Sequence, residues 1–330
     1  MKNKKIFITG GAGFLGKNII KRYYNDNDIT IYSRDEAKHY YLKKSYPKLN
    51  CIIGDVKDYD RLNKAAKGHN IGIFAASLKQ IEAVDQNVEV GIETIINGAI
   101  NSRKIAEENN FEAACFISSD KSRAATTLYG AMKFVAGESF IVNSEKSNVR
   151  LSTAIYGNVL NSTGSIIPLI WDAINKDYKL TLYSKNMTRF MIGADEAVDL
   201  IEHALTLDGV NVIPNLLAFR VKDLFEIYKE KFNLKYKIGE PRISEKLHEM
   251  MFSVEESPRI KKLSSKTLHI YDNHGFYQTD DNSRFIMHYK DIYDEILPFN
   301  EFTSDKVVIN KNALDKTLSQ NNYFKPNYGY

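Results

Sequence analysis

The feature that most constrains the fold is a glycine-rich turn between an apolar run and a helix-like stretch near the start of the chain. The run KIFIT at 5–9 is followed by GGAGFLG at 10–16, and a helical pattern then continues to about residue 24. In such a unit the first glycine permits a tight turn, the second lets backbone N–H groups approach a pyrophosphate, and the third lets helix and strand pack closely. The phosphates would lie at the positive end of the helix. The predicted dinucleotide contacts are Gly10, Gly13, Phe14, Leu15 and Gly16.

Strand-like and helix-like segments alternate through the first half of the chain. The short runs rich in β-branched and aromatic residues are KIFIT, DITIY, NCIIG, IGIFAA, EAACFISS and VRLSTAIY. Helical patterns lie between them, at about 14–24, 58–67, 88–108 and 128–143. This alternation predicts an α/β fold with a Rossmann-type, doubly wound parallel sheet.

The pattern loosens beyond Gly157. Helical stretches near 167–175, 194–205 and 222–232 are separated by Pro, Gly and Asn. We expect a cofactor domain at 1–156 that also carries the catalytic residues, and a smaller substrate-binding lobe at 157–330. Segments near 186–228 could return to the first domain. The polar stretch from about 316 to the last residue is interpreted as a surface tail.

Composition argues against several classes of partner. The chain has 45 basic and 41 acidic residues, and a net charge of +4 is weak support for nucleic-acid binding. No apolar run approaches the roughly 20 residues of a membrane helix. Cys51 and Cys115 each lie in an apolar run, which favours reduced core thiols and a cytoplasmic location. No Cys/His cluster has the spacing of a metal site, so we expect no metal.

The residues after the second predicted strand bear on the choice between NAD and NADP. An NAD site usually has a carboxylate there for the ribose 2′-hydroxyl, whereas NADP needs a cation for the extra phosphate. Here the strand ends in Ser33 and Arg34, the acids come later, and Lys38 follows. We therefore favour NADP over NAD. The alternative is that Arg34 and Lys38 are solvated charges at a helix start.

Two further turns should border the dinucleotide. Asp55 and Val56 follow the third strand and could bind the adenine, although an ordinary turn explains them equally well. Ala75 and Ala76 follow the fourth strand, where small side chains let the chain pass close to the cofactor.

Candidate chemistry follows the fifth strand. Ser119, Asp120 and Lys121 end that strand, and Tyr129 and Lys133 come next, four residues apart on one helix face. A neighbouring ammonium stabilises a phenolate and lowers its pKa, so Tyr129 could act as a base. The alternatives are that Tyr129 packs a helix start and that Lys121 is a solvated charge.

Together these residues resemble the extended short-chain dehydrogenase/reductases. Within that group of enzymes, several longer sequence motifs resemble the inverting UDP-N-acetylglucosamine 4,6-dehydratases. They are SRDEAK, GDVKD, AASLKQ, SSDKS, YGAMK, YGNVLNSTGSIIPL, NMTRF and SEKLHE, and the resemblance runs from about residue 4 to 251. It implies an NADP-dependent lyase for surface glycan synthesis that assembles as a homo-oligomer.

The resemblance also implies roles for the catalytic residues. Tyr129 would take the sugar's 4-hydroxyl proton, Lys121 would remove the C5 proton, and Asp120 would protonate the departing 6-hydroxyl. A lysine base must be partly neutral and a carboxylic acid must stay protonated, so burial should raise the pKa of Asp120. Ser119 would bond the sugar, and Lys133 would also hold the nicotinamide ribose.

For the UDP-sugar, the resemblance implies contacts from the second half of the chain and one from the first. They are Lys79, Asn158, Arg189, Arg242 and Glu245. Structural ion pairing is the alternative for the two arginines, and His248 is interpreted as structural.

The chain departs from the family pattern at Ile95, Ile155 and Thr163, where relatives carry asparagine, arginine and arginine. These departures keep a UDP-sugar 4-epimerase, a 4-ketoreductase and a non-catalytic dinucleotide scaffold as alternatives.

Overall fold

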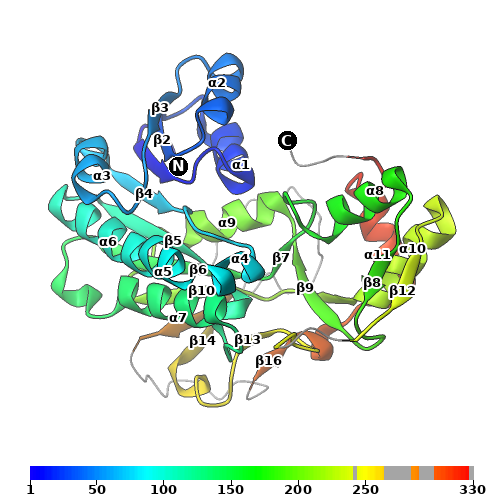
Figure 1. The fold of residues 1–330 in the computed structure, drawn as a ribbon. Helices are drawn as coiled ribbons and strands as arrows, with labels where there is room; N and C mark the ends of the chain where they lie inside the picture. Colours follow the sequence, from blue (N-terminus) through cyan, green and yellow to red (C-terminus); the bar gives the residue numbers. More distant parts are fainter. Residues whose placement is uncertain (241–243, 264–283, 290–300, 327–330) are drawn as a thin grey trace.

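A central, mostly parallel sheet organises the molecule (Figure 1). The structure, a computed structural model, describes residues 1–240, 244–263, 284–289 and 301–326. Strands β1 to β6 and β10 run parallel, and β15 is antiparallel to both of its neighbours. In sheet order the strands are β14 (Ile260–Leu263), β15 (Arg284–His288), β10 (Val210–Pro214), β6 (Arg150–Tyr156), β5 (Ala113–Ser119), β4 (Ile71–Phe74), β1 (Lys5–Thr9), β2 (Asp28–Ser33) and β3 (Asn50–Ile53). The predicted fold class and the six predicted strands are confirmed.

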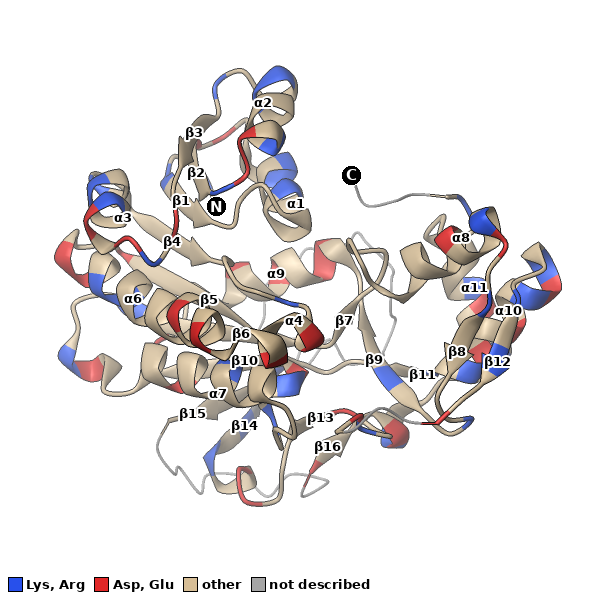
Figure 2. Ribbon diagram, viewed as in Figure 1, with Lys and Arg blue, Asp and Glu red and all other residues tan. Residues whose placement is uncertain are grey.

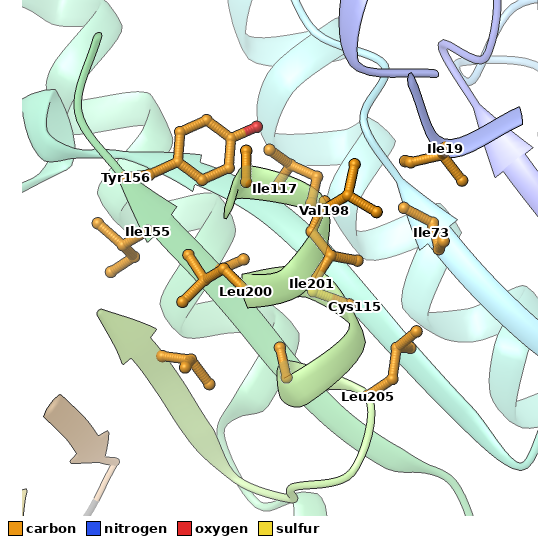
Figure 3. Close-up of a cluster of buried hydrophobic side chains, with 14 of the residues drawn as sticks. Ile19, Ile73, Cys115, Ile117, Ile155, Tyr156, Val198, Leu200, Ile201 and Leu205 are labelled. Atoms are coloured by element: carbon orange, nitrogen blue, oxygen red, sulfur yellow. The ribbon is translucent and has the colours of Figure 1, made fainter. Parts of the chain in front are cut away.

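Successive residues of a strand point to opposite faces of the sheet, and here both faces carry apolar side chains. Helices therefore cover both faces. In β1, Ile6 and Ile8 belong to one buried cluster, and Phe7 belongs to the other. The first cluster is completed by α1 (Phe14–Tyr23), α2 (Glu36–Ser45) and α9 (Ala194–Ala204). The second is completed by α3 (Tyr59–Ala66), α4 (Ile81–Gln86), α6 (Gly98–Glu108) and α7 (Leu128–Ile141). Figure 3 shows Val198 and Ile201 of α9 beside Cys115 and Ile117 of β5.

The helix predicted at 88–108 is interrupted. It divides into α5 (Val88–Gly91), a π-helical segment η1 (Ile92–Asn97) and α6. Gly91 and Gly98 flank the π segment, and glycine has poor helix propensity. Wide π turns of this kind are often found beside functional sites, and this one contacts α7.

The smaller lobe lies to one side of the sheet (Figure 1). Its core includes Trp171, Tyr228 and Leu318. The elements around that core are α8 (Ile166–Lys176), β8 (Leu180–Leu182), α10 (Val221–Phe232), β12 (Tyr236–Ile238) and α11 (Lys311–Gln320). Shorter strands lie between this lobe and the main sheet: β7 (Asn158–Val159), β9 (Thr188–Ile192), β11 (Ala218–Arg220), β13 (Met250–Phe252) and β16 (Phe302–Thr303).

The surface tail predicted from about residue 316 is wrong for its described part. Helix α11 continues to Gln320, with Leu314 and Leu318 buried. The Tyr228 hydroxyl donates a hydrogen bond to the Tyr323 carbonyl at 2.7 Å. The two leucines are four residues apart and form one apolar stripe, which outweighs the polar composition of the segment.

Charge and cysteine placement fit this architecture. Figure 2 shows the charged residues mostly on the helices and loops around the sheet. Cys51 and Cys115 are both free, as predicted, and their strands β3 and β5 are separated in the sheet by β2, β1 and β4. In the described part of the chain, every helix is too short or too polar to cross a bilayer.

Candidate active site

The glycine loop brings backbone, rather than side chains, to the carboxyl edge of the sheet. Gly10 has φ +69°, and a Cβ there would lie 2.8 Å from the Ala76 nitrogen. A Cβ at Gly16 would overlap the Gly11 backbone. Both positions therefore require glycine, as the sequence predicts. The predicted contacts Phe14 and Leu15 begin α1 directly after Gly13.

The start of α1 is suited to an anion. Gly13 is the N-cap residue, no side chain caps the helix, and the first turn carries no acidic residue. The first backbone N–H groups of a helix lack partners within it and attract negative charge. These features fit the pyrophosphate of a dinucleotide.

The residues predicted to read the adenosine ribose lie at the end of β2 and the start of α2. The Ser33 hydroxyl is 2.6 Å from the His39 ring nitrogen. Arg34 is largely exposed and pairs loosely with Asp55 at 3.8 Å, whereas Lys38 pairs with Asp35 at 2.7 Å. The Asp35 carboxylate also caps α2 by accepting from the Lys38 backbone N–H. No carboxylate therefore stands at the end of β2 itself.

The other predicted cofactor residues follow neighbouring strands. Val56 is buried, and the Asp55 carboxylate accepts from the backbone N–H of Lys57 at 3.1 Å. Ala75 and Ala76 follow β4, and the Ala75 N–H donates to the Thr9 carbonyl at the end of β1. Since β1, β2, β3 and β4 are parallel, their following loops gather at one edge of the sheet.

Beside this edge, β5 delivers a buried acid. A short 3₁₀ turn, η2 (Asp120–Ser122), follows the strand directly. Asp120 is 1% exposed, and its Oδ1 accepts from the Ser119 hydroxyl at 2.8 Å. Its Oδ2 is buried and has no hydrogen-bond partner among the described residues. Burial, reinforced by the nearby Glu249, raises the pKa of Asp120, as the proposed acid requires.

Tyr129 and Lys133 lie together in the first turns of α7, which Thr127 caps. Burial raises the pKa of Tyr129 to about 12, although Lys121 acts in the opposite direction. Burial also lowers the pKa of Lys133 to about 8. The Lys133 ammonium donates to the Ile117 carbonyl at 3.0 Å. The predicted lowering of the Tyr129 pKa is therefore wrong, because burial outweighs the opposing charge, which comes from Lys121 rather than Lys133.

A glycine inside the same motif sets the spacing between α7 and η2. A Cβ at Gly130 would overlap the backbone carbonyl oxygen of Lys121. The helix that carries Tyr129 can therefore pack against the turn that carries Asp120 and Lys121 only because residue 130 has no side chain.

Lys121 lies between two carboxylates. Its Nζ is 3.4 Å from Asp120 Oδ1 and 3.3 Å from Glu249 Oε1. Burial alone would lower the pKa of Lys121, but Asp120 and Glu249 raise it above its usual range. These two ion pairs therefore favour the charged form of the amine.

Sequence reasoning missed Glu249. It lies in the SEKLHE motif that supports the resemblance, where the sequence predicts a substrate contact at Glu245 and a structural role for His248. An acid directly before the apolar run MMF is too common a pattern to single it out, and only its burial, which the packing decides, shows that it needs partners. His248 bonds Thr188 at 2.8 Å, which agrees with its structural interpretation.

The predicted substrate residues are brought partly together. Arg189, on β9, donates to Glu245 Oε1 at 2.5 Å and lies 3.4 Å from Glu249 Oε1. Asn158, on β7, has a buried side-chain oxygen with no partner among the described residues. Lys79 donates to the Thr163 carbonyl and so joins the loop after β4 to the loop after β7. Arg242 lies outside the described residues.

The two isoleucine departures have apolar surroundings. Ile95 is 1% exposed and packs in the same cluster as Tyr129 and Met132. Ile155 is buried in β6 on the opposite side of the sheet. Thr163 supplies only its backbone to the Lys79 contact.

A pocket opens where η2, α4 and the segment before β13 meet. Its lining combines charged and hydroxyl groups, which suits a polar ligand better than an apolar one. The lining residues are Ile81, Glu82, Asp85, Lys121, Thr126, Thr127, Ser244, Glu245, Lys246 and Glu249.

Comparison with known families shows where this chain belongs. The model of a family described as "Polysaccharide biosynthesis protein" matches residues 6–270. The chain belongs to this family. The match extends through the cofactor edge, the catalytic turn and the charged segment around Glu249, so it covers the whole of the described site.

Three relatives illustrate the kinds of protein to which this chain is similar in sequence. An inverting UDP-N-acetylglucosamine 4,6-dehydratase of Campylobacter jejuni is 34% identical over 78% of this chain and 80% of its own length. An uncharacterized membrane protein of Methanocaldococcus jannaschii is 33% identical over 79% and 84%. A UDP-glucose 4-epimerase of Rickettsia bellii is 30% identical over 80% and 82%. The resemblance to the inverting dehydratases is confirmed.

A solved structure extends the fold comparison to almost the whole chain. Pen from Bacillus thuringiensis superposes with a TM-score of 0.84 at 23% identity, covering 98% of this chain and 99% of that one. Both the central sheet and the smaller lobe therefore follow an architecture that is already known.

Proposed function

We propose that this protein is a UDP-N-acetylglucosamine 4,6-dehydratase, a lyase that forms a UDP-4-keto-6-deoxy-N-acetylhexosamine with inversion at C5 for surface glycan synthesis. The observation that carries the proposal is the contact of Asp120 and Lys121 with each other, within electrostatic reach of Tyr129. Elimination of water needs an acid and a base in addition to the tyrosine, whereas a simple oxidation at C4 does not need them. The name and 34% identity of the Campylobacter relative support the same reaction.

Each residue then has a defined proton to move. Tyr129 accepts the proton of the 4-hydroxyl as a phenolate, the form that the charge on Lys121 favours against the effect of burial. The ammonium of Lys121 passes a proton to Asp120, 3.4 Å away, which produces the neutral amine and the protonated acid together. The amine removes the C5 proton, and Asp120 protonates the departing 6-hydroxyl as water. When the hydride returns to C6, a proton that exchanges with water is added to C5 from the opposite face, which inverts that centre. Ser119, which donates to Asp120, orients that acid.

The edge of the sheet that carries the glycine loop fits a nicotinamide dinucleotide, and we propose NADP rather than NAD. When bound, the cofactor supplies the acceptor for a hydride from C4 and returns that hydride to C6. Gly10, Gly13 and the start of α1 would hold its phosphates. Arg34, exposed and only loosely paired, would bind the 2′-phosphate, with Lys38 nearby.

The same edge would hold the rest of the dinucleotide. Asp55 and Val56 would border the adenine, Ala75 and Ala76 would let the chain pass close to it, and Lys133 would hold the nicotinamide ribose.

For the UDP portion, we propose the substrate contacts that the sequence predicts. Arg189, with its planar fork, and Arg242 would bind the pyrophosphate. Glu245 would reach the uridine ribose. Asn158 has a buried oxygen without a described partner, which makes it available to a ligand. Lys79 would face the sugar from the loop after β4.

The second candidate is a UDP-sugar 4-epimerase, supported by the Rickettsia relatives and by the burial of Tyr129 and Lys133, the two residues that epimerisation needs. It leaves the Asp120–Lys121–Glu249 contacts without a purpose, and we therefore place it second.

One experiment separates the two functions. The protein is incubated with UDP-N-acetylglucosamine in heavy water and followed by proton NMR and mass spectrometry. Dehydration gives a mass loss of one water, a new 6-methyl signal and deuterium at C5. Isomerisation without loss of water would instead establish the epimerase, and unchanged sugar with tightly bound dinucleotide would indicate a scaffold.

We further propose that the protein forms a homo-oligomer in the cytoplasm. Helices α6 and α7 contact each other and carry exposed apolar residues, namely Ile100, Phe134 and Val135. Such residues on neighbouring helices suit burial against a second copy. Free thiols at Cys51 and Cys115 suit a reducing compartment. Sedimentation at micromolar concentration tests the assembly, and a monomer would contradict it.

A further inference from the structure

A buried carboxylate, Glu249, touches the amine of the proposed base. Its side chain is 4% exposed, and its Oε1 lies 3.3 Å from Lys121 Nζ and 3.4 Å from Arg189 Nε. Its Oε2 is buried and has no hydrogen-bond partner among the described residues. Burying an ion costs several kcal/mol unless partners compensate. The position of Glu249 is therefore best explained by what its charge does to Lys121 and its neighbours.

The backbone holds Glu249 firmly in this place. Its N–H donates to Ser304 Oγ at 2.9 Å, and the Ser304 N–H donates back to the Glu249 carbonyl at 2.8 Å. The following strand β13 pairs with β16, which directly precedes Ser304. Glu249 is 128 residues from Lys121 in the chain, so only the packing of the C-terminal segment brings the two together.

Two acids share one amine here, and their surroundings differ. Burial tends to raise the pKa of Glu249, yet Lys121, Arg189 and Lys246 together lower it. Burial raises the pKa of Asp120, and Glu249 raises it further. Two carboxylates whose surroundings move their pKa values apart take different roles. The charged and titratable groups that face the amine are Asp120 on η2, Tyr129 on α7, Arg189 on β9 and Glu249 before β13. The other charged residues that line the pocket are Glu82, Asp85, Glu245 and Lys246.

We propose that Glu249 is a positioning residue of the dehydration site. It fixes the Lys121 amine beside Asp120. As the permanent anion of the cluster, it also keeps bound the proton that Lys121 and Asp120 share. The inference rests on the proposed function, in which that proton makes Asp120 an acid and its transfer makes Lys121 a base. Without the charge of Glu249, Asp120 would be the principal anion beside Lys121. The pair would then release its proton at lower pH.

The test compares Glu249→Gln with Glu256→Gln. Glu256 is a matched control because it too is a poorly exposed carboxylate in an ion pair, with Arg123 at 2.6 Å, but it does not line the pocket. The ligand-free proteins are labelled with trace acetic anhydride at pH 9, and mass spectrometry gives the labelling rate of Lys121 relative to all other lysines. Only the neutral amine reacts, so each unit lost from its pKa raises the rate about tenfold.

We expect Lys121 of Glu249→Gln to be labelled about tenfold faster or more than in the wild type, because removing a charge at this distance moves a pKa by about 1–3 units. Glu256→Gln should match the wild type. An equal labelling rate in Glu249→Gln and the wild type overturns the proposal. Should Glu249→Gln fail to fold, Glu249→Asp retains the charge and must keep the slow labelling of the wild type; fast labelling there overturns the proposal equally.

Turnover supplies an independent second readout. In the pH profile of water loss, the alkaline limb, where the shared proton is lost, should move to lower pH by about one unit or more in Glu249→Gln and stay in place in Glu256→Gln. A reduced rate with an unmoved limb would mean that Glu249 acts only on the fold. If the wild type releases no water, the proposed function fails, while the labelling result still decides the role of Glu249.

Discussion

The cofactor edge and the catalytic cluster occupy neighbouring positions in the molecule but are built in opposite ways. At the cofactor edge, residues 10–16 act through backbone groups, and the glycines matter because a side chain would not fit. In the cluster, side chains of Lys121, Arg189 and Glu249 meet from three distant parts of the chain. The first is a local conformation, whereas the second is a set of long-range ion pairs.

This difference determines how each region should fail. A local turn depends on allowed backbone angles and close packing, so an added methyl group should damage both its folding and its cofactor binding. A buried ion cluster depends on charge balance, so a change of charge should damage chemistry while leaving the remote turn intact. The predictions below test this separation, beginning with the largest expected effect.

Lys121→Met should damage the catalytic cluster and leave the cofactor edge intact. We expect the rate of water loss to fall by about 10²–10⁴-fold, the usual contribution of a positioned acid or base. Dinucleotide affinity, measured by calorimetry, should remain within about twofold of the wild type. Lys57→Met, at a lysine outside the pocket, is the control. Normal turnover in Lys121→Met would remove this residue from the mechanism.

The reverse separation should follow from Gly10→Ala. The new methyl group would meet the backbone of Ala75 and Ala76 at a residue with φ +69°. We expect a loss of about 3 kcal/mol in the free energy of unfolding, from steric overlap and backbone strain combined, together with weakened dinucleotide binding. Gly68→Ala is the matched control, because Gly68 has φ +77° and open space around its would-be Cβ. It should lose only about 1 kcal/mol. Equal losses in both variants would contradict the packing argument.

The contribution of Lys133 to stability tests whether the start of α7 is buried. Its folded-state pKa of about 8 lies below the ordinary 10.5, so between these values the unfolded chain binds a proton that the folded chain does not. Stability from this residue should therefore rise as pH increases from about 8 to 10.5 and be absent below that window. The gain, on the order of 3 kcal/mol, is measured by urea unfolding of the ligand-free protein relative to Lys133→Met. Parallel curves for the two proteins would show that Lys133 is not desolvated.

The smallest effect concerns the choice of dinucleotide. Arg34→Ala should weaken NADP binding by about tenfold while changing NAD binding little, because one exposed charge-assisted contact to the 2′-phosphate is lost. Lys38→Ala should have less effect, since Lys38 already pairs with Asp35 at 2.7 Å. Calorimetry with both dinucleotides measures the difference. Equal losses for NAD and NADP would assign Arg34 a structural role.

Much of the fold could be read from the sequence because its signals are local. The run KIFIT, the glycine turn and the next five strand-like runs each carry their own periodicity, and parallel strands with helices between them have few possible arrangements. Two local readings still differ from the structure. Gly91 and Gly98 accompany a π segment in the helix predicted at 88–108, and the predicted tail contains the end of α11. In the second case, two leucines on one face outweigh polar composition.

The sequence by itself determined the cofactor turn, the alternation of strands and helices in the first half and the spacing of Tyr129 and Lys133, because backbone conformation and helical periodicity depend on neighbours in the chain. Only the tertiary structure decided that Lys121 is shared between Asp120 and Glu249, and that Arg189 joins them. Electrostatic interaction depends on distance in space and on burial, and neither is encoded in the separation of residues along a chain.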